Sequence, residues 1–222
     1  MTSRRSNRFR VQVVPSADDS YATSFPLTEN PLSEGGKWVN GKAEGLDWND
    51  VQSIPGEAHA SVLSGLGASR YDDSIAHLSD SFVTFAADQY AEGTVHRAPG
   101  YSPTGNHEVE LLLRFSITAH DAHGYELLWG HQGPIAIVRW NGPLGDYTPL
   151  LDGLQIGAAV DGDVLRAEIA GNVITVYKNG VLVATGPPDS TWTGGQPGIG
   201  FWPVDASTPG SYGWKGFTAG VV

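Results

Sequence analysis

The sequence predicts an all-β protein: an antiparallel two-sheet β-sandwich preceded by a short basic N-terminal arm. Its 222 residues include 29 glycines and 14 prolines. The apolar residues come in short runs between clusters of Gly, Pro, Asn and Asp, as in proteins built from many strands joined by turns. No window shows a sustained apolar period of 3.6 residues, so helix is expected to be scarce. A chain of this length fits a single sandwich domain.

The strands are expected in short, regularly spaced segments along the whole chain. They are predicted near residues 11–14, 23–27, 36–39, 58–63, 81–86, 89–97, 107–118, 124–131, 134–140, 154–160, 163–170, 172–178, 180–185, 197–204 and 212–221. The stretches 65–80 and 98–106 are the least periodic, and we expect them to be surface loops where binding groups collect. The arm and a lead-in strand are assigned to residues 1–22, and the sandwich to residues 23–222.

Two stretches show the strand pattern most clearly. In "GNVITVYKNGVLVATG", residues 171–186, side chains alternate on both sides of Asn179-Gly180, which predicts a hairpin with a type I′ turn. In "HEVELLLRFSIT" the pattern predicts one apolar face, interrupted on the polar side only by Leu112. That apolar face contains Val109, Leu111, Leu113, Phe115 and Ile117.

Charge is divided unevenly between the arm and the body. Residues 11–222 contain 9 basic and 24 acidic groups, whereas residues 1–10 have no acid. The four arginines of this arm are Arg4, Arg5, Arg8 and Arg10. Such an arm docks on an acidic surface of another protein subunit or on nucleic acid, or it is a solvated tail. The acidic body disfavours direct binding to nucleic acid.

Other classes of protein are excluded by what the sequence lacks. There is no cysteine, so a disulfide or a thiolate metal site cannot form. No run of about 18 apolar residues suggests a membrane span, and the N-terminus shows no apolar core of a signal peptide. "GLGASR" lacks the ending and the setting of a phosphate-binding loop.

The C-terminal part carries a family resemblance. From about residue 160, "DGDVLRAEIAGNVITVYKNGVLVATGPPDSTWTGGQPGIGFW" resembles the second half of the concanavalin A-like (laminin G-like) jelly-roll superfamily, and "DSFVTFAADQYAEGTV" and "VELLLRFS…GYELLW" are similar to the first half. The resemblance implies a concanavalin A-like jelly roll. This fold carries lectins, carbohydrate-binding modules, glycosidases, polysaccharide lyases and virion proteins, so it leaves function open.

Two catalytic alternatives follow from the resemblance. Retaining glycosidases need two carboxylates about 5 Å apart. Glu108 and Glu110 lie on one face of one predicted strand at about this spacing. The alternative is that Glu110 and Arg114, on the same face, form a surface charge ladder. A polysaccharide lyase acting on acidic polysaccharide would use Arg114, Tyr125 and His131 as neutralising and proton-transferring groups.

No cofactor is required by these patterns, but a structural calcium ion is possible because jelly rolls of this resemblance often hold one. The candidate ligands are Asp72, Asp73, Asp161 and Asp163. The loop "TAHDAHG" brings His120, Asp121 and His123 close together, so a transition-metal site formed by them with His131 is the alternative.

Glycan binding would use aromatic rings that stack on sugar faces. The candidates are Trp48, Tyr71, Tyr101, Trp129, Trp140 and Trp192. We expect a non-catalytic interaction module, a phage capsid-decorating or tail protein on a virion surface or another extracellular component, with the arm docked on neighbouring subunits and possible glycan binding. The alternatives are a stand-alone carbohydrate-binding module and the lyase.

Overall fold

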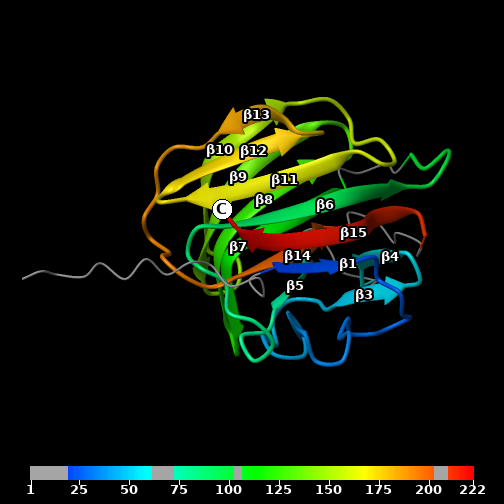
Figure 1. Ribbon diagram of the computed structural model, residues 1–222, viewed down its shortest axis with the longest axis horizontal. Helices are drawn as coiled ribbons and strands as arrows, with labels where there is room; N and C mark the ends of the chain where they lie inside the picture. The colour runs from blue at the N-terminus through cyan, green and yellow to red at the C-terminus, as the bar shows by residue number, and fades with distance from the viewer. Residues whose placement is uncertain (1–19, 62–72, 103–106, 203–209) are drawn as a thin grey trace, which may run out of the picture.

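The computed structural model describes residues 20–61, 73–102, 107–202 and 210–222. Within these ranges the chain forms strands packed as two antiparallel sheets, which confirms the predicted β-sandwich (Figure 1). None of these residues belongs to a helix with the length and hydropathy needed to cross a membrane. The predicted strand at 11–14 and the arginines of the arm lie outside the described residues.

Sheet A has the order β13-β12-β11-β6-β15-β4-β3, with β1 paired to β15. Its strands are β1 (Ser20–Thr23), β3 (Val51–Ile54), β4 (Glu57–Ala60), β6 (Gln89–Arg97), β11 (Val164–Ala170), β12 (Val173–Lys178), β13 (Val181–Thr185) and β15 (Tyr212–Val221).

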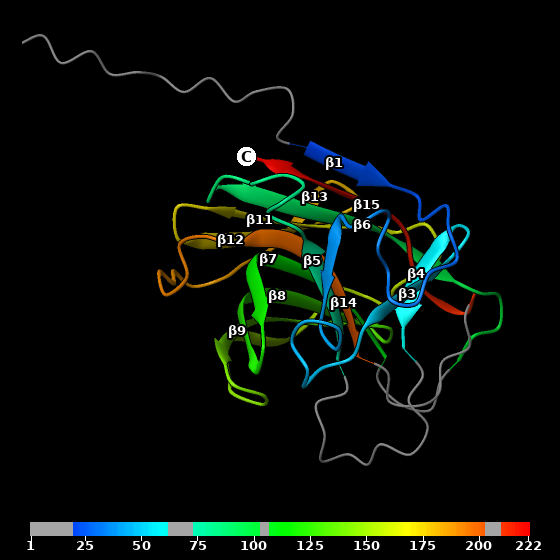
Figure 2. The ribbon, with the colours of Figure 1, turned by 90° about the horizontal axis from the view of Figure 1, so that it is seen from below.

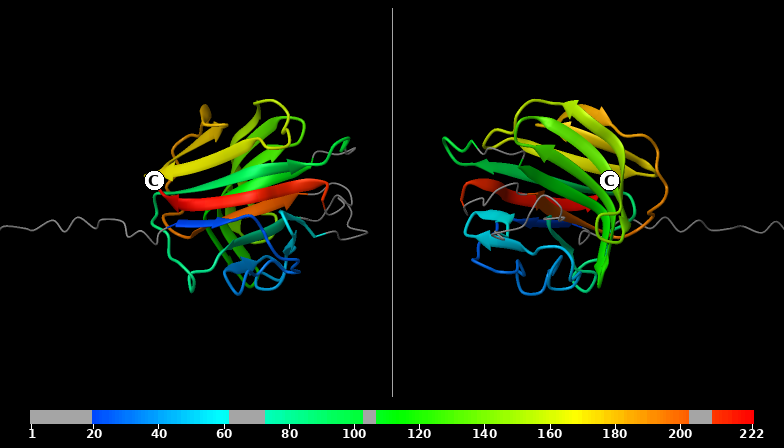
Figure 3. Two further views of the ribbon diagram at one scale, coloured as in Figure 1. Left: turned by 45° about the vertical axis from the view of Figure 1, so that its right-hand side comes forward. Right: turned by 180° about the vertical axis from the view of Figure 1, so that it is seen from behind.

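Sheet B has the order β10-β9-β8-β7-β14-β5-β2. Its strands are β2 (Trp38–Asn40), β5 (Ser74–Leu78), β7 (Glu108–Thr118), β8 (Asp121–Gly130), β9 (Pro134–Gly142), β10 (Tyr147–Gln155) and β14 (Gln196–Trp202). Figure 2 shows the two sheets as separate layers, and the right-hand view of Figure 3 brings sheet B to the front.

The main core lies between the sheets and is filled by alternate residues of both. On β11, Leu165, Ala167 and Ile169 are buried while their neighbours are partly exposed, as expected of a strand with one covered face. The predicted hairpin is also present, since β12 and β13 are joined by Asn179 (φ 51°) and Gly180 (φ 77°). These positive φ angles are those of a type I′ turn.

Strand β7 departs from the single apolar face that the sequence predicts. Its register with β8 shifts between Leu113 and Ser116, and Arg114 has a φ of 48°. This bulge reverses the alternation. Leu113 therefore faces the main core, whereas Phe115 and Ile117 join a second apolar cluster on the outer face of sheet B, the face turned away from sheet A.

The predicted loop at 65–80 was wrong in its last part, because residues 74–78 form β5. All five of these residues are buried. Ala76 and Leu78 face the main core, and Ile75 packs in the second cluster against Trp48. A strand covered on both faces shows no polar alternation, so the periodicity test could not detect it.

Several other strand boundaries also differ from the prediction. Residues 82–86 are irregular rather than extended, and β3 was missed. The strand expected at 154–160 instead occupies Tyr147–Gln155, an edge strand whose pairing with β9 is interrupted by two register shifts. Bulges of this kind are common at sheet edges, and they obscure the regular alternation.

Candidate functional site

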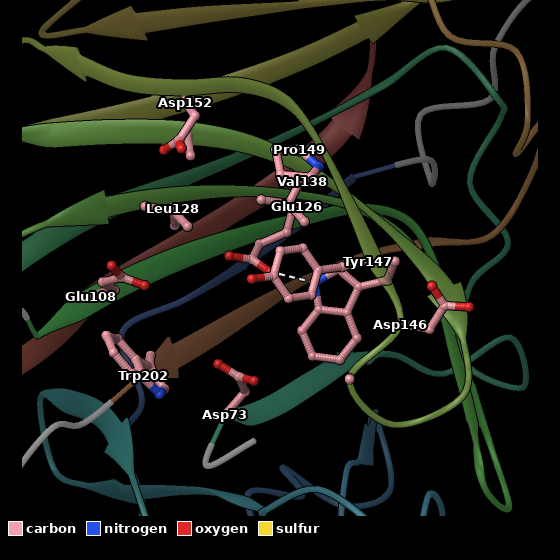
Figure 4. A pocket seen from close by; sticks show the side chains of 13 residues that line it. Asp73, Glu108, Glu126, Leu128, Val138, Asp146, Tyr147, Pro149, Asp152 and Trp202 are labelled. Carbon is pink, nitrogen blue, oxygen red and sulfur yellow. Dashed lines mark hydrogen bonds between the residues drawn. The ribbon is translucent and has the colours of Figure 1, made fainter. Parts of the chain in front are cut away.

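A groove of about 450 Å³ lies on the outer face of sheet B. It crosses β7, β8 and β9 and is bounded by β10, by the end of β14 and by the residue that precedes β5 (Figure 4). The groove is lined by Asp73, Glu108, Glu126, Leu128, Ala136, Val138, Trp140, Gly145, Asp146, Tyr147, Pro149, Asp152 and Trp202. We use "the groove" for this set of residues.

Strand register explains why these side chains meet. Trp202 of β14 pairs with Glu108 of β7, and residues paired across strands share a face of the sheet. Farther along, Glu126 of β8 pairs with Leu112, two residues beyond Glu110. The outer face of β7 therefore presents Glu108 and Glu110 in sequence, with Glu126 diagonally across from Glu110.

Two glycines on β14 leave space beside these carboxyl groups. Gly200 lies between Glu110 and Ile75 in the register, and a Cβ atom at Gly200 would collide with the carboxyl group of Glu110. Gly198 lies between Leu112 and His77. The centre of β14 is therefore flat, and the side chain of Glu110 occupies the surface that a larger residue would fill.

Two buried carboxyl groups lie at the groove: Glu126 lines it, and Glu110 lies beneath it. Burial raises the pKa of Glu110 well above its ordinary value, and the nearby Glu126, Asp73 and Glu108 raise it further. Burial likewise raises the pKa of Glu126, helped by Asp73 and opposed by a hydrogen bond that Trp140 Nε1 donates to Glu126. Burial therefore favours the protonated form of both groups more than it does in an exposed glutamate.

The charge of the groove is of one sign. Among the residues that the structure describes, its lining includes five acidic residues and no Lys, Arg or His. Besides Glu126, these acidic residues are Asp73, Glu108, Asp146 and Asp152. Such a surface attracts cations and repels anions.

Three aromatic residues accompany the acids. Tyr147, on the edge strand, is 49% exposed, and Trp202 is partly exposed beside Glu108. Trp140 forms part of the floor and packs against Trp48 at 5.9 Å and Phe115 at 5.4 Å between ring centroids. Figure 4 shows Trp202, Glu108 and Asp73 near one another, with Tyr147 and Asp146 on the other side.

Comparison with known proteins identifies the fold. No protein-family model and no curated protein matches the chain. Carbohydrate-binding module CBM66 from Bacillus subtilis superimposes with a TM-score of 0.54, covering 84% of this chain and 93% of that one at 14% identity. A β-1,3-1,4-glucanase (lichenase) derived from a mouse hindgut metagenome gives 0.53, with coverage of 91% and 99% at 13% identity. The β-glucanase of Bacillus licheniformis gives 0.50, with 93% and 96% at 16% identity.

The fold is the concanavalin A-like jelly roll. This confirms the expectation drawn from the C-terminal strings. At such low sequence identity the likeness extends to the fold alone, so the function has to be argued from the groove.

The aromatic residues proposed from sequence occupy different parts of the jelly roll. Trp140 lines the groove, and Trp48 lies beneath it with 1% of its surface exposed. Trp129 is fully buried between the sheets and belongs to the main core. Tyr101 stacks on Tyr212. None of these four except Trp140 lines the groove.

The other two proposed aromatic residues are Trp192 and Tyr71. Trp192 stacks on His123 with ring centroids 4.2 Å apart and donates a hydrogen bond to the carbonyl of Trp140. It lies outside the groove lining. Tyr71 lies outside the described residues.

The residues proposed for a lyase do not line the groove. Arg114 is buried and donates hydrogen bonds to the carbonyls of Ala87, Trp192 and Gly171, which also places it away from the charge ladder expected with Glu110.

Tyr125 and His131 have interior positions as well. The hydroxyl of Tyr125 donates to Asp189, and Nδ1 of His131 accepts a hydrogen bond from the backbone N–H of His107. Both side chains are buried, so neither offers a reacting group to a ligand in the groove.

The candidate calcium ligands are spread over the molecule. Asp73 lines the groove. Asp161 accepts hydrogen bonds from Arg97 N–H and Lys215, and Asp163 accepts them from Asn179 and the N–H of Val160. Asp72 lies outside the described residues.

The two histidines of the "TAHDAHG" loop each contact a different aspartate. His120 contacts Asp47 at 2.9 Å, and His123 contacts Asp121 at 2.6 Å. Among the residues that the structure describes, no group of three or more His, Cys, Asp or Glu side chains has a geometry suited to a metal ion.

Sequence reasoning missed most of the groove. Glu126, Asp146, Tyr147, Asp152 and Trp202 were not singled out, although Glu108 was. The available signal was the string "GIGFW", in which two glycines alternate along the strand that ends in Trp202. Alternating glycines in a strand can mark a surface that another group approaches closely.

Proposed function

We propose that the groove binds carbohydrate. A volume of about 450 Å³ falls within the range of small-molecule sites, roughly 300–1,000 Å³. Sugar rings present an apolar face to aromatic side chains, and their hydroxyls donate hydrogen bonds to carboxylates. The groove combines both kinds of group, and two similar folds are a carbohydrate-binding module and a lichenase.

The observation that carries the proposal is the pairing of Trp202 with Glu108. Both side chains belong to register partners on adjacent strands and line the groove together. A sugar lying over the Trp202 ring would place hydroxyl groups within reach of the Glu108 carboxylate. Tyr147 of the edge strand β10 supplies a second, half-exposed ring.

The arrangement favours binding over glycoside hydrolysis. Hydrolysis by two carboxyl groups requires both of them to reach the scissile bond. Of the pair proposed from sequence, Glu108 lines the groove, but Glu110 is fully buried beneath it. The acidic lining also disfavours a lyase for uronate polymers, which needs positive charge to neutralise the substrate.

The test is to measure glycan binding by isothermal titration calorimetry after an array screen, with Trp202→Ala and Tyr147→Ala beside the unmodified chain. Loss of one stacking ring is expected to weaken binding about tenfold. Tyr177→Ala serves as the matched control, because Tyr177 lies on β12 of the other sheet.

Two outcomes of the binding experiment would overturn or change the proposed function. If no glycan binds, or if both groove variants bind as the unmodified chain does, the proposal is wrong. If new reducing ends accumulate during incubation with a bound glycan, the groove is catalytic rather than only binding.

The virion role expected from the basic arm remains a separate prediction. It rests on Arg4, Arg5, Arg8 and Arg10, which lie outside the described residues. Deletion of residues 1–14 should abolish incorporation into an assembly while leaving the thermal unfolding of the sandwich unchanged. Normal incorporation of the truncated chain would contradict it. Structural calcium is likewise tested by whether a chelator lowers the unfolding temperature.

A further inference from the structure

The groove is long, because residues that line it lie far apart in sheet B. Through the pairing of β7, Trp202 lies level with Gly130 of β8. Through the pairing of β9, Tyr147 lies level with Gly124 of the same strand. Residues rise about 3.3 Å along a strand, so these two levels are about 20 Å apart along β8.

The order of the strands separates Trp202 and Tyr147 in the second direction as well. Trp202 is on β14 and Tyr147 is on β10, with β7, β8 and β9 between them. Neighbouring strands are about 4.8 Å apart, so the backbones of the two residues are separated by about 27 Å on the diagonal. Both residues line the groove, which therefore runs obliquely across the strands.

The groove is also shallow. A compact pocket of about 450 Å³ would enclose one small ligand, whereas the same volume spread between Trp202 and Tyr147 forms a shallow depression. A ligand that fills the groove therefore lies along the surface of sheet B, with one side open to solvent.

The middle of the groove has a level floor. Leu128 of β8 pairs with Ala136 of β9, and Glu126 pairs with Val138. All four residues line the groove. The short side chains of Ala136 and Val138 are buried at its base, so β9 raises no barrier between the two ends.

We propose that the groove recognises several consecutive sugar units of a linear glycan rather than a single terminal sugar. The proposal rests on the proposed function, since it names the class of carbohydrate for the same groove. One sugar ring would lie against Trp202 and another against Tyr147, and the units between them would cross the floor at Ala136 and Val138. A disaccharide is too short to contact both aromatic residues.

The experiment measures how binding depends on the length of the glycan. The probes are linear fragments of β-glucan, xylan, mannan, galactan and chitin, each from disaccharide to hexasaccharide, titrated calorimetrically into the full chain. For a glycan that binds, the hexasaccharide should bind at least about tenfold more tightly than the disaccharide, because it gains a second aromatic ring. Equal affinity throughout the series would contradict the proposal.

Substitutions at the two ends test whether one chain contacts both. With the hexasaccharide, Trp202→Ala and Tyr147→Ala should each weaken binding about tenfold, and the double variant about a hundredfold, since distant residues act additively. With the disaccharide, at most one of the two substitutions should have this effect. Tyr177→Ala, on β12 of sheet A, is the control and should change neither affinity.

Two results with these variants would overturn the proposal. If both single substitutions weaken disaccharide binding about tenfold, the two rings contact the same sugar unit. If only one of them weakens hexasaccharide binding, the chain does not reach the other end of the groove.

A substitution in the floor tests the path between the ends. Ala136→Phe should remove the advantage of the hexasaccharide and leave disaccharide binding unchanged, because the added ring obstructs the middle of the groove. Thr175→Phe on β12 of sheet A is the matched control. Thermal unfolding shows whether each variant is folded. A folded Ala136→Phe chain that keeps the full dependence on length would contradict the proposed path.

The outcomes distinguish this inference from the proposed function. If a glycan binds with an affinity that does not depend on its length, the extended recognition is wrong and carbohydrate binding stands. If none of the glycans binds, the proposed function fails, and this inference fails with it.

Discussion

Acidic residues have different neighbours on the outer faces of the two sheets. On sheet A, Arg166 lies between Glu92 at 3.7 Å and Glu168 at 2.6 Å, and its guanidinium stacks over Tyr90, 3.5 Å from the ring centroid. On sheet B, five acidic residues gather among the described residues that line the groove. The acids around Arg166 are paired with a cation, whereas the acids of the groove lie beside one another.

This difference indicates that the acidic groove of sheet B does not serve the stability of the fold. A neutralised ladder such as that of Arg166 is an ordinary feature of an exposed sheet and contributes little to folding. Placing Glu110 and Glu126 together beside further acids opposes folding, because burial and the neighbouring acids disfavour the ionised form of both carboxyl groups. Unfavourable electrostatics of this kind are typical of binding sites.

The largest effect is expected from a pair of arginine substitutions, one in each sheet. Arg114→Ala should lower the free energy of unfolding by about 3–5 kcal/mol, because three carbonyls lose their donor at the β7 bulge. Arg166→Ala, on the exposed ladder, should cost less than about 1 kcal/mol. Urea denaturation measures the free energy of unfolding of both variants. Similar losses would contradict the expected difference between the two arginines.

A smaller effect is expected in the pH dependence of stability. Glu110 and Glu126 have raised pKa values in the folded protein, and burial also raises the pKa of Glu57 to about 7. Their contribution is fully present below about pH 4.5, the pKa of an unfolded glutamate, and is lost as the pH rises through the folded values. The free energy of unfolding should therefore decrease from about pH 5 to about pH 8.

Substitution of Glu110 tests whether the decrease in unfolding free energy with pH comes from the groove. Glu110→Gln should reduce the slope by up to about 1.4 kcal/mol per pH unit, the value for one proton. Glu92→Gln should leave the slope unchanged, because Glu92 lies on the balanced ladder. Denaturation at several pH values checks both variants, and an unchanged slope for Glu110→Gln would mean that Glu110 is ionised throughout this range.

The smallest effect is expected in the hairpin of sheet A. Gly180→Ala should cost about 1 kcal/mol, since Gly180 has a φ of 77° that alanine adopts with strain. The space around it is open, so no collision adds to the cost. Thermal unfolding measures the loss, and glycan binding should be unaffected because the hairpin lies outside the groove.

Much of the fold could be predicted because side-chain alternation and turn residues are visible in short stretches of the sequence. The strands β6, β7, β8, β9 and β11 to β15 lie close to their expected ranges, and the Asn179-Gly180 turn fixes one hairpin. Strand β5 was missed since both of its faces are buried. The faces of β7 were assigned wrongly beyond Leu113, because nothing in the local pattern reveals the bulge at Arg114.

The sequence by itself determined the two-sheet sandwich, its hairpin turns and its acidic character, because alternation and turn residues act over a few neighbouring positions. Only the tertiary structure decided which acids share a surface. Glu108, Glu126, Asp73 and Trp202 come from four separate segments, and strand order and register bring them together. Such long-range pairing is specified by the packing of the whole core, so a local pattern cannot disclose it.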